Sequence, residues 1–274
     1  MPFISIIIPT LNEEKYLPPL LKDLTLQTNL DFEVIVVDAH SPDKTAEYAS
    51  KFATKLPHFT LLNSAKRNVS YQRNIGAKMA KGQYLLFMDA DNRLPHYYLE
   101  GIRYRLHKNT PELFTTWCVA DTHLNSDKAV ANVMNISLEA AKMIDNPYAY
   151  GALIGCTKKL FQSTAGFDET MKFSEDVEFV FRCSKNGFKL HIFKDPCYIL
   201  SLRRFRKLGK LKTLQKGALL TLKTFTNIRF DQQKEYPMGG SEYITPKLQK
   251  TFTSVSNKPK ILEKIKTLID SLDE

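Results

Sequence analysis

Long hydrophobic runs are missing from this 274-residue sequence, and their absence excludes one large class of proteins. No apolar run approaches the roughly 18 residues that a membrane-spanning helix needs. The apolar start of the chain has no basic segment and meets Pro9 after a short run, so it predicts a first strand rather than a signal peptide. Together with the 43% hydrophobic and 25% charged content, these absences favour a soluble globular protein.

Cysteine is scarce and scattered. The four cysteines form no CxxC pair and no spacing typical of a zinc site: Cys118, Cys156, Cys183 and Cys197. Thiols without paired spacing are typical of a reducing compartment. We therefore expect a cytoplasmic protein.

The two commonest phosphate-binding loops are also missing. The sequence has no GxxxxGK[ST] segment and no GxGxxG after a predicted strand. If a phosphate-bearing ligand binds here, a metal ion or cationic side chains must neutralise it.

Acidic residues are absent from one stretch of the chain. Between residues 203 and 229 there are nine Lys and Arg and no Asp or Glu, so most of the net charge of +10 belongs to this segment. Leucines at helical spacing in 206–230 predict a basic amphipathic helix. Such a helix either packs its apolar stripe on the rest of the chain or makes peripheral contact with the cytoplasmic face of a membrane. Nucleic acid is not an expected partner, because no aromatic stacking pattern interleaves the charges.

Short apolar strands alternate with helices in the first half of the chain. Strands are predicted over 3–8, 32–37, 59–62 and 83–88, and helices over 14–26, 41–52 and 69–81, the last closed by Gly82. The second half is less regular, with strands over 113–120, 151–156, 188–193 and 198–201 and helices over 128–144 and 174–185, besides a short helix that stops at Gly166.

The pattern predicts an α/β fold. Strands that are apolar on both faces and alternate with helices indicate a parallel sheet covered on both sides. The irregular second half predicts a Rossmann-like mixed sheet flanked by helices over residues 1–205, followed by a helical extension over 206–274. Ligands of such sheets bind at the carboxyl ends of the strands.

Two aspartates stand at one of these strand exits. Asp89 and Asp91 follow a run of five apolar residues in "QYLLFMDADN". Residues i and i+2 of an extended chain point to the same side, so both carboxylates can bind one Mg²⁺ or Mn²⁺ ion. The alternative is a turn in which aspartate caps backbone amides. The two residues alone do not decide between these interpretations.

Four segments, taken in order, resemble the family 2 glycosyltransferases with the GT-A fold. They are "SIIIPTLNEEKYLPPLL", "FEVIVVDAHSPDKT", "QRNIGAKMAKGQYLLFMDADN" and "GFDETMKFSEDVEFVFRCSKNG", and the resemblance covers about residues 4–205. It implies a nucleotide-diphospho-sugar donor, first a UDP-sugar and second a GDP-sugar. It also implies a saccharide or lipid-linked acceptor and a Mg²⁺ or Mn²⁺ cofactor.

The resemblance implies a role for each matching residue. Donor-binding roles fall on the nucleoside pocket, on the base-binding Asp38 and on basic residues near the diphosphate: Pro9, Thr10, Asn12, Glu14, Asp38, Arg73, Asn74, Arg203 and Arg204. Asp89 would lie nearest the donor ribose or sugar, and Asp91 would be the main metal ligand. Strand-end, helix-cap and solvated-surface roles remain the alternatives for several of these residues.

A second acidic pair, Glu175 and Asp176, is the predicted catalytic pair. The alternative is structural, because acids in the first turn of a helix are stabilised by its dipole. The resemblance implies that Asp176 is the general base of an inverting transfer. That chemistry needs a carboxylate to take the acceptor proton, and a free Asp, with a pKa of about 3.9, is ionised at neutral pH.

The sequence also departs from parts of the wider family. It has no QxxRW segment, its only tryptophan is Trp117, and no membrane spans are present. Addition of one sugar is therefore expected rather than polymerisation. Two rival functions remain: a nucleotidyltransferase acting on sugar phosphates, and an inactive GT-A scaffold with a basic membrane-binding extension.

Overall fold

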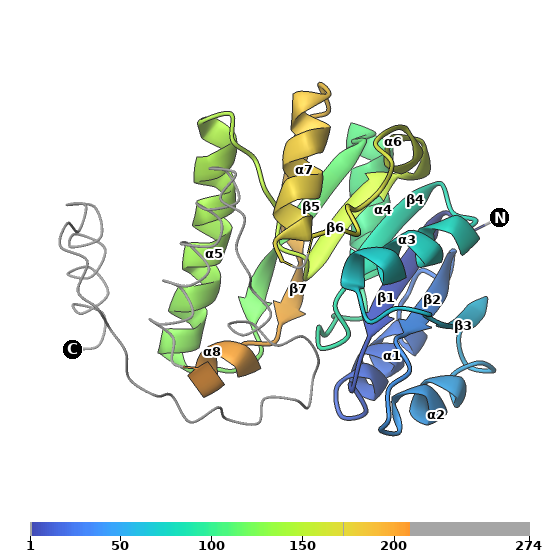
Figure 1. Cartoon of the computed structure of the whole chain (residues 1–274). Coiled ribbons are helices and arrows are strands. Elements are labelled where there is room, and N and C mark those ends of the chain that lie inside the picture. The colour runs from blue at the N-terminus through green and yellow to red at the C-terminus, as the bar shows by residue number, and fades with distance from the viewer. Residues whose placement is uncertain (1, 172, 209–274) are drawn as a thin grey trace, which may run out of the picture.

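A mixed seven-stranded sheet forms the centre of the molecule (Figure 1). The computed structural model describes residues 2–171 and 173–208. The strand order is β3-β2-β1-β4-β6-β5-β7. The strands are β1 (Ile4–Thr10), β2 (Phe32–Asp38), β3 (Phe59–Asn63), β4 (Tyr84–Met88), β5 (Leu113–Ala120), β6 (Leu153–Thr157) and β7 (Leu190–Leu200). β6 runs antiparallel to β4 and β5, and every other pair is parallel, which confirms the predicted mixed sheet.

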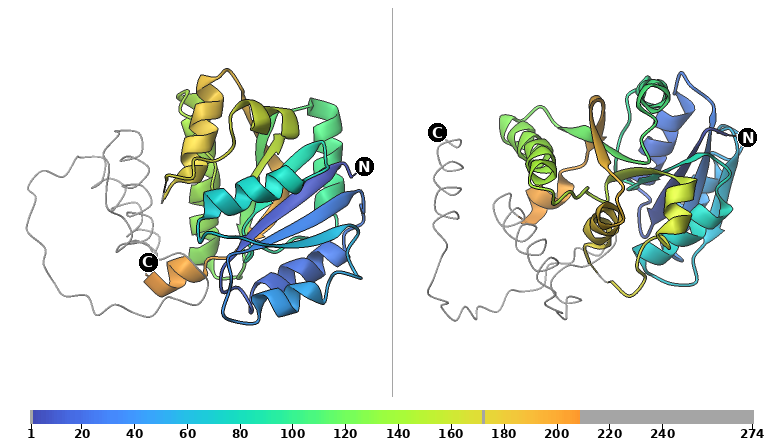
Figure 2. Two further views of the ribbon diagram at one scale, coloured as in Figure 1. Left: turned by 45° about the vertical axis from the view of Figure 1, so that its right-hand side comes forward. Right: turned by 90° about the horizontal axis from the view of Figure 1, so that it is seen from above.

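Helices cover both faces of the sheet (Figure 2). They are α1 (Leu17–Thr25), α2 (Thr45–Ser50), α3 (Val69–Met79), α4 (Tyr98–Asn109), α5 (Asn125–Met143), α6 (Lys158–Ser163), α7 (Glu175–Lys185) and α8 (Arg203–Leu208). α1, α2, α4 and α5 contribute side chains to one apolar core, and α3, α6 and α7 contribute to the other. Among these described helices, none has the length and apolarity to cross a membrane.

The two cores explain why the predicted strands are apolar throughout. In β4, Leu86 and Met88 pack into the core beneath α1 and α4, while Leu85 and Phe87 pack into the core beneath α3 and α7. Successive side chains of a strand point to opposite faces, so a strand covered on both sides needs apolar residues at every position. β4 lies between β1 and β6 and is buried along its whole length.

The structure corrects three predictions. α4 was not predicted, although four of its residues are buried at helical spacing: Tyr98, Leu99, Ile102 and Leu106. The strands predicted at 188–193 and 198–201 form the single strand β7. The closing role of Gly82 after α3 is also wrong, because α3 ends at Met79 and its C-cap residue Ala80 already has extended backbone.

Gly82 is required for a different reason. A Cβ at this position would lie 2.7 Å from the backbone nitrogen of Ser5, so the chain passes too close to β1 for any side chain. Gly166 and Gly187, in contrast, have φ angles of +68° and +87°, which are the left-handed conformations expected of a glycine that ends a helix.

The basic extension lies almost entirely beyond the described residues. α8 ends at Leu208, so the amphipathic helix predicted within 206–230 and its membrane contact fall outside the described part of the chain from residue 209 onward. The division at residue 205 stays a prediction.

Candidate active site

The sequence-predicted residues gather at the carboxyl edge of the sheet. Thr10, the last residue of β1, pairs with Asp38, the last residue of β2. The register between β1 and β4 pairs Ile7 with Phe87. The segment Asp89–Asp91, called the DAD segment below, therefore leaves β4 at the same edge. This is the edge at which α/β sheets bind ligands.

Asp38 is buried, and its carboxylate is hydrogen-bonded to Thr10 at the end of β1 and to Ser41 in the loop after β2. Its Oδ1 accepts hydrogen bonds from the hydroxyls of Thr10 (3.0 Å) and Ser41 (2.6 Å), and its Oδ2 accepts one from the Ser41 N–H (2.8 Å). These contacts fix the direction of the carboxylate. Pro9 and Thr10, the last two residues of β1, are buried and pair with the end of β2, so neither belongs to an exposed surface.

Asn12 and Glu14, in the segment that follows β1, have different surroundings. Asn12 is buried with a φ of 57°, its N–H donates to the Ser41 hydroxyl, and its Oδ1 has no hydrogen-bond partner among the described residues. A buried acceptor without a partner is suited to a ligand that brings a donor. Glu14 instead accepts a hydrogen bond from the Lys44 N–H at 3.1 Å, at the start of α2.

The loop that carries Asp89 and Asp91 is fastened to three elements. The Asp89 N–H and the Asn92 side chain both donate to the Ala152 carbonyl next to β6. The backbone of Arg93 exchanges two hydrogen bonds with Ile199 of β7. Its guanidinium pairs with Asp23 of α1 at 2.5 Å. The two aspartates are therefore held in place before any ligand binds.

Arg73 joins the DAD segment to the second acidic pair. It is buried on α3, with 2% of its side chain exposed, so it does not lie on a solvated helix face. Its Nη1 donates to Glu175 at 2.7 Å, and its Nη2 donates to Asp89 at 3.3 Å and to the Gly151 carbonyl at 3.1 Å. One cation thus links Asp89 to Glu175, which lies 102 positions beyond Arg73 in the sequence.

Asp176 lies on the other side of Gly151. Its Oδ2 accepts the Gly151 N–H at 2.5 Å, and its Oδ1 accepts the Val177 N–H at 2.8 Å. Burial, together with the charge of the adjacent Glu175, raises the pKa of Asp176 to about 7, against the opposing influence of Arg73. Glu175, the other predicted catalytic residue, is buried and contacts Arg73.

Arg203 brings the start of α8 to the same edge. Its Nε lies 2.8 Å from Asp91 Oδ2, and its Nη2 donates to both carboxylate oxygens of Glu13 at 2.9 and 3.1 Å. Arg204 also acts on the site, because its charge lowers the pKa of Asp89. Both arginines therefore act on carboxylates of this edge, and their contact with the diphosphate stays a prediction.

Glu13 is a site residue that the sequence reasoning missed. It is buried, and burial raises its pKa to about 7 despite the opposing contact with Arg203. The resemblance indicated Glu14 instead. Asn12, directly before Glu13, has a left-handed backbone, and no local sequence signal distinguishes the two glutamates.

Asn74 has a different environment from the one expected of a donor contact. Its Nδ2 donates to the Phe167 carbonyl at 2.9 Å and to Glu169 at 3.0 Å, and its Oδ1 accepts the Phe167 N–H at 2.9 Å. These bonds fasten the segment before α7 to α3. The arrangement gives Asn74 a positioning role for the loop that leads to Asp176.

The acidic groups around Asp91 suit a small divalent ion. Burial, together with the charge of Asp91, raises the pKa of Asp89 to about 6 against the opposing charge of Arg73, although 42% of the Asp89 side chain remains open to solvent. A bound cation offsets the electrostatic repulsion between two neighbouring carboxylates. Within residues 2–171 and 173–208 no group of three or more His, Cys, Asp and Glu forms a metal site. Two carboxylates with ligand and water oxygens are the usual Mg²⁺ arrangement, so the residues present fit such an ion.

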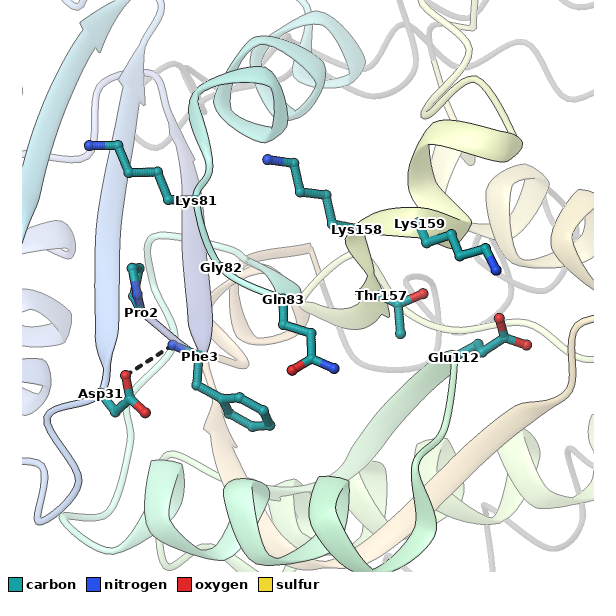
Figure 3. A pocket seen from close by; sticks show the side chains of 10 residues that line it. All are labelled: Pro2, Phe3, Asp31, Lys81, Gly82, Gln83, Glu112, Thr157, Lys158 and Lys159. Atoms are coloured by element: carbon teal, nitrogen blue, oxygen red, sulfur yellow. Dashed lines mark hydrogen bonds between the residues drawn. The ribbon is translucent and has the colours of Figure 1, made fainter.

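A hollow of about 540 Å³ lies at the opposite edge of the sheet (Figure 3). It is lined at the start of β1 and at the end of β6, with the side chains of Phe3, Lys81, Lys158 and Lys159 around it. None of its ten lining residues belongs to the predicted site. The site is therefore defined by its convergent polar groups and not by this hollow.

A comparison with protein families also matches the part of the chain that carries most of this site. The model of the family described as "Glycosyl transferase family 2" matches residues 5–163, more than half of the chain. The chain belongs to glycosyl transferase family 2. The match includes Asp38, Arg73, Asp89 and Asp91 but ends before Asp176, so the assignment of the second acidic pair rests on its geometry and on the resemblance of its own segment.

The curated relatives include two poly(ribitol-phosphate) beta-N-acetylglucosaminyltransferases. Poly(ribitol-phosphate) beta-N-acetylglucosaminyltransferase TarP of Staphylococcus aureus (strain N315) is 27% identical over 219 residues, which is 76% of this chain and 65% of TarP. TarS of strain Mu50, with the same activity name, is 24% identical over 206 residues, 73% of this chain and 35% of TarS. The uncharacterized glycosyltransferase EpsJ of Bacillus subtilis is 34% identical over 92 residues, 34% of this chain and 27% of EpsJ. The matched region thus spans from about a quarter to two thirds of these relatives.

Solved structures establish the fold. TarS 1–349 of S. aureus in complex with UDP-GlcNAc has a TM-score of 0.61 at 22% identity, covering 73% of this chain and 59% of that chain. The mannosyltransferase PcManGT from Pyrobaculum calidifontis, in complex with GDP-Man and Mn²⁺, has a TM-score of 0.60 at 22% identity, covering 73% and 56%. These neighbours confirm the predicted GT-A fold for this family 2 chain.

Proposed function

We propose that this chain is a metal-dependent, inverting glycosyltransferase. It moves one sugar from a nucleotide-diphospho-sugar to an acceptor hydroxyl. The observation that carries the proposal is the bridge made by Arg73, which contacts Asp89 on one side and the carbonyl of Gly151 on the other, while the Gly151 N–H holds Asp176. A metal-binding pair and a base are thereby connected through one buried cation. Membership of family 2 favours glycosyl transfer over the nucleotidyltransferase alternative.

The donor side is formed by the ends of β1, β2 and β4. The Oδ1 of Asn12, which lacks a partner among the described residues, and the oriented carboxylate of Asp38 offer acceptors to the N–H groups of a base. A uridine diphosphate donor is proposed first, since the TarS complexes hold UDP and UDP-GlcNAc; GDP-sugars come second, after the PcManGT complex. Arg203 and Arg204 are the cationic side chains for the diphosphate.

Asp91 and Asp89 would hold Mg²⁺ or Mn²⁺ together with the donor diphosphate. When bound, the ion stabilises the negative charge that develops on the departing nucleoside diphosphate. Arg73 orients Asp89 from the opposite side.

Asp176 is the proposed general base. As the acceptor oxygen forms its bond to the anomeric carbon, the bond from that carbon to the diphosphate breaks, and the acceptor proton passes to a carboxylate oxygen of Asp176. Attack from the side opposite the leaving group inverts the anomeric configuration. The raised pKa of Asp176 strengthens it as a base, and the fixed Gly151 and Val177 amides hold its direction.

The acceptor is proposed only by class. The names of TarS and TarP point to polyol phosphate polymers, and a saccharide or lipid-linked hydroxyl stands beside them as the second class. An acceptor screen with UDP-GlcNAc and these two classes is the direct approach.

Matched substitutions test the two acidic pairs separately. Asp176→Asn should leave UDP binding in the presence of Mn²⁺ within about twofold and should lower transfer by about 10²- to 10⁴-fold, the usual contribution of a general base. Asp91→Asn should weaken Mn²⁺-dependent UDP binding by about tenfold or more. Asp195→Asn, whose side chain is 72% exposed, is the control that should change neither.

The configuration of the product provides a second measurement. Nuclear magnetic resonance of the product formed from an α-linked donor should show a β-linkage. Full turnover by Asp176→Asn would remove Asp176 from the mechanism. Retention of vesicle binding without any transfer by the unaltered chain would instead favour the inactive scaffold.

A further inference from the structure

Arg203 is held on three sides within the site. Besides its contacts with Asp91 and Glu13, its guanidinium carbon lies 3.8 Å from the centre of the Tyr16 ring. The remaining nitrogen, Nη1, is buried and has no hydrogen-bond partner within the part of the chain that the structure describes. An arginine with three neighbours and one unsatisfied donor is positioned for a further anion.

The backbone of Glu13 is held in position by contacts that do not involve Arg203. Its N–H donates to the Thr45 hydroxyl at 2.8 Å, and its carbonyl accepts the N–H groups of Tyr16 and Leu17 at the start of α1. The backbone on both sides of the carboxylate is therefore anchored. Glu13 can keep its two bonds to Arg203 Nη2 when other contacts of that arginine change.

Asp91 is the group for which Arg203 and a divalent ion would compete, because two cations at one carboxylate repel each other. Its Oδ2 is the atom that contacts Arg203 Nε, and a divalent ion bound there would displace that contact. The displaced Nε and the buried Nη1 would then both need an anion. A diphosphate carried in with the ion supplies one.

We propose that Glu13 is a positioning residue for donor binding. It holds Arg203 in the site while Asp91 exchanges the guanidinium for the divalent ion, and the released Arg203 then binds the diphosphate. This inference rests on the proposed function. It has a thermodynamic consequence: Arg203 competes with the ion alone, whereas the ion and the nucleoside diphosphate bind cooperatively.

Calorimetric titration of Mn²⁺ alone, and of UDP in excess Mn²⁺, tests the exchange. Arg203→Gln should bind Mn²⁺ alone about three- to tenfold more tightly, because the competing cation is lost. The same variant should bind UDP in Mn²⁺ about tenfold or more weakly, because a charge-assisted contact is lost. These opposite signs distinguish exchange from general damage to the fold, which weakens both affinities.

Arg203→Lys is a milder substitution that is less prone to disturb folding. It distinguishes the effect of the positive charge from the effect of the forked guanidinium geometry. It keeps the positive charge, so Mn²⁺ alone should bind within about twofold of its affinity for the unaltered chain, but a single ammonium cannot replace the forked contacts and UDP should bind more weakly. Arg103→Gln, which removes an arginine paired with Asp31, is the control expected to change neither affinity.

A double-mutant cycle tests Glu13 itself. Glu13→Gln should weaken UDP binding in Mn²⁺ by about tenfold in the unaltered background and by less than about twofold in the Arg203→Gln background, since its effect passes through Arg203. An equal loss in both backgrounds would overturn the positioning role. An unchanged or weaker Mn²⁺ affinity in Arg203→Gln would overturn the exchange. Absence of any UDP or GDP binding by the unaltered chain would overturn the proposed donor class and this inference together.

Discussion

Asp176 shows how single neighbours adjust one carboxyl group. Glu175 is adjacent in the chain and raises the pKa of Asp176, while Arg73 and two backbone amides act in the opposite direction. The balance leaves the pKa at about 7 rather than near that of a free aspartate. Because a protonated carboxyl cannot accept a proton, Asp176 can act as the proposed base only above this range.

The pH dependence of transfer follows from this balance. With donor and Mn²⁺ saturating, kcat should fall as the pH drops below about 7, the pKa of Asp176. Glu175→Gln removes the negative neighbour that raises this pKa, so the midpoint of the acidic limb should move to lower pH. A profile of kcat against pH for the two proteins provides the measurement. A midpoint that stays in place or rises in Glu175→Gln would contradict the assignment.

At the scale of the elements, two glycines that follow helices have opposite requirements. Gly187 ends α7 with a φ of +87°, and a Cβ added there would have no described atom within 4 Å, whereas a Cβ on Gly82 would meet the backbone of β1. Asparagine tolerates the left-handed conformation but still needs room. Gly187→Asn should therefore lower the free energy of unfolding by less than about 1 kcal/mol, and Gly82→Asn by more than about 2 kcal/mol.

Urea unfolding of the two variants measures this difference. Equal losses would mean that backbone conformation, and not space, governs both positions. Substitution at Gly82 is expected to act through stability, since Gly82 lies at the edge of the sheet opposite the site.

Features that follow from local sequence patterns were predictable, whereas features that depend on contacts between distant segments were not. Strands such as β4 were predictable because a strand covered on both faces must be apolar at every position. The clustering of Asp38 with the DAD segment followed from the shared edge of parallel strands. The reason for Gly82 was not predictable, because it depends on a contact with Ser5 of β1, 77 residues earlier. Glu13 was missed for a related reason, since its partner Arg203 lies 190 residues later in the sequence.

At the scale of the whole molecule, donor binding should appear as stability. A ligand that binds only the folded state at about 100 times its Kd stabilises it by about 2.7 kcal/mol. For a folded region of this size that corresponds to a rise in Tm of about 5–10 °C. UDP should produce this rise with Mn²⁺ present and not after chelation with EDTA, as measured by thermal denaturation across UDP-, GDP- and dTDP-sugars.

The variant Asp91→Asn is the control for this thermal denaturation experiment. It should unfold at a similar temperature without ligand and show no Mn²⁺-dependent rise. A rise with UDP that persists in EDTA would argue against a metal-dependent donor site.

The reversed direction of β6 has a consequence for how this molecule can change over evolution. β1, β2 and β4 carry the proposed donor half of the site as the chain leaves the sheet, but β6 begins at the same edge, so the chain enters there through residues 144–152. The half that holds Asp176 can therefore vary separately, joined to the first half by Arg73 and Gly151. Under the proposed mechanism, residues 144–150 are therefore the segment in which we would begin a directed-evolution library for acceptor choice, while the donor half is kept.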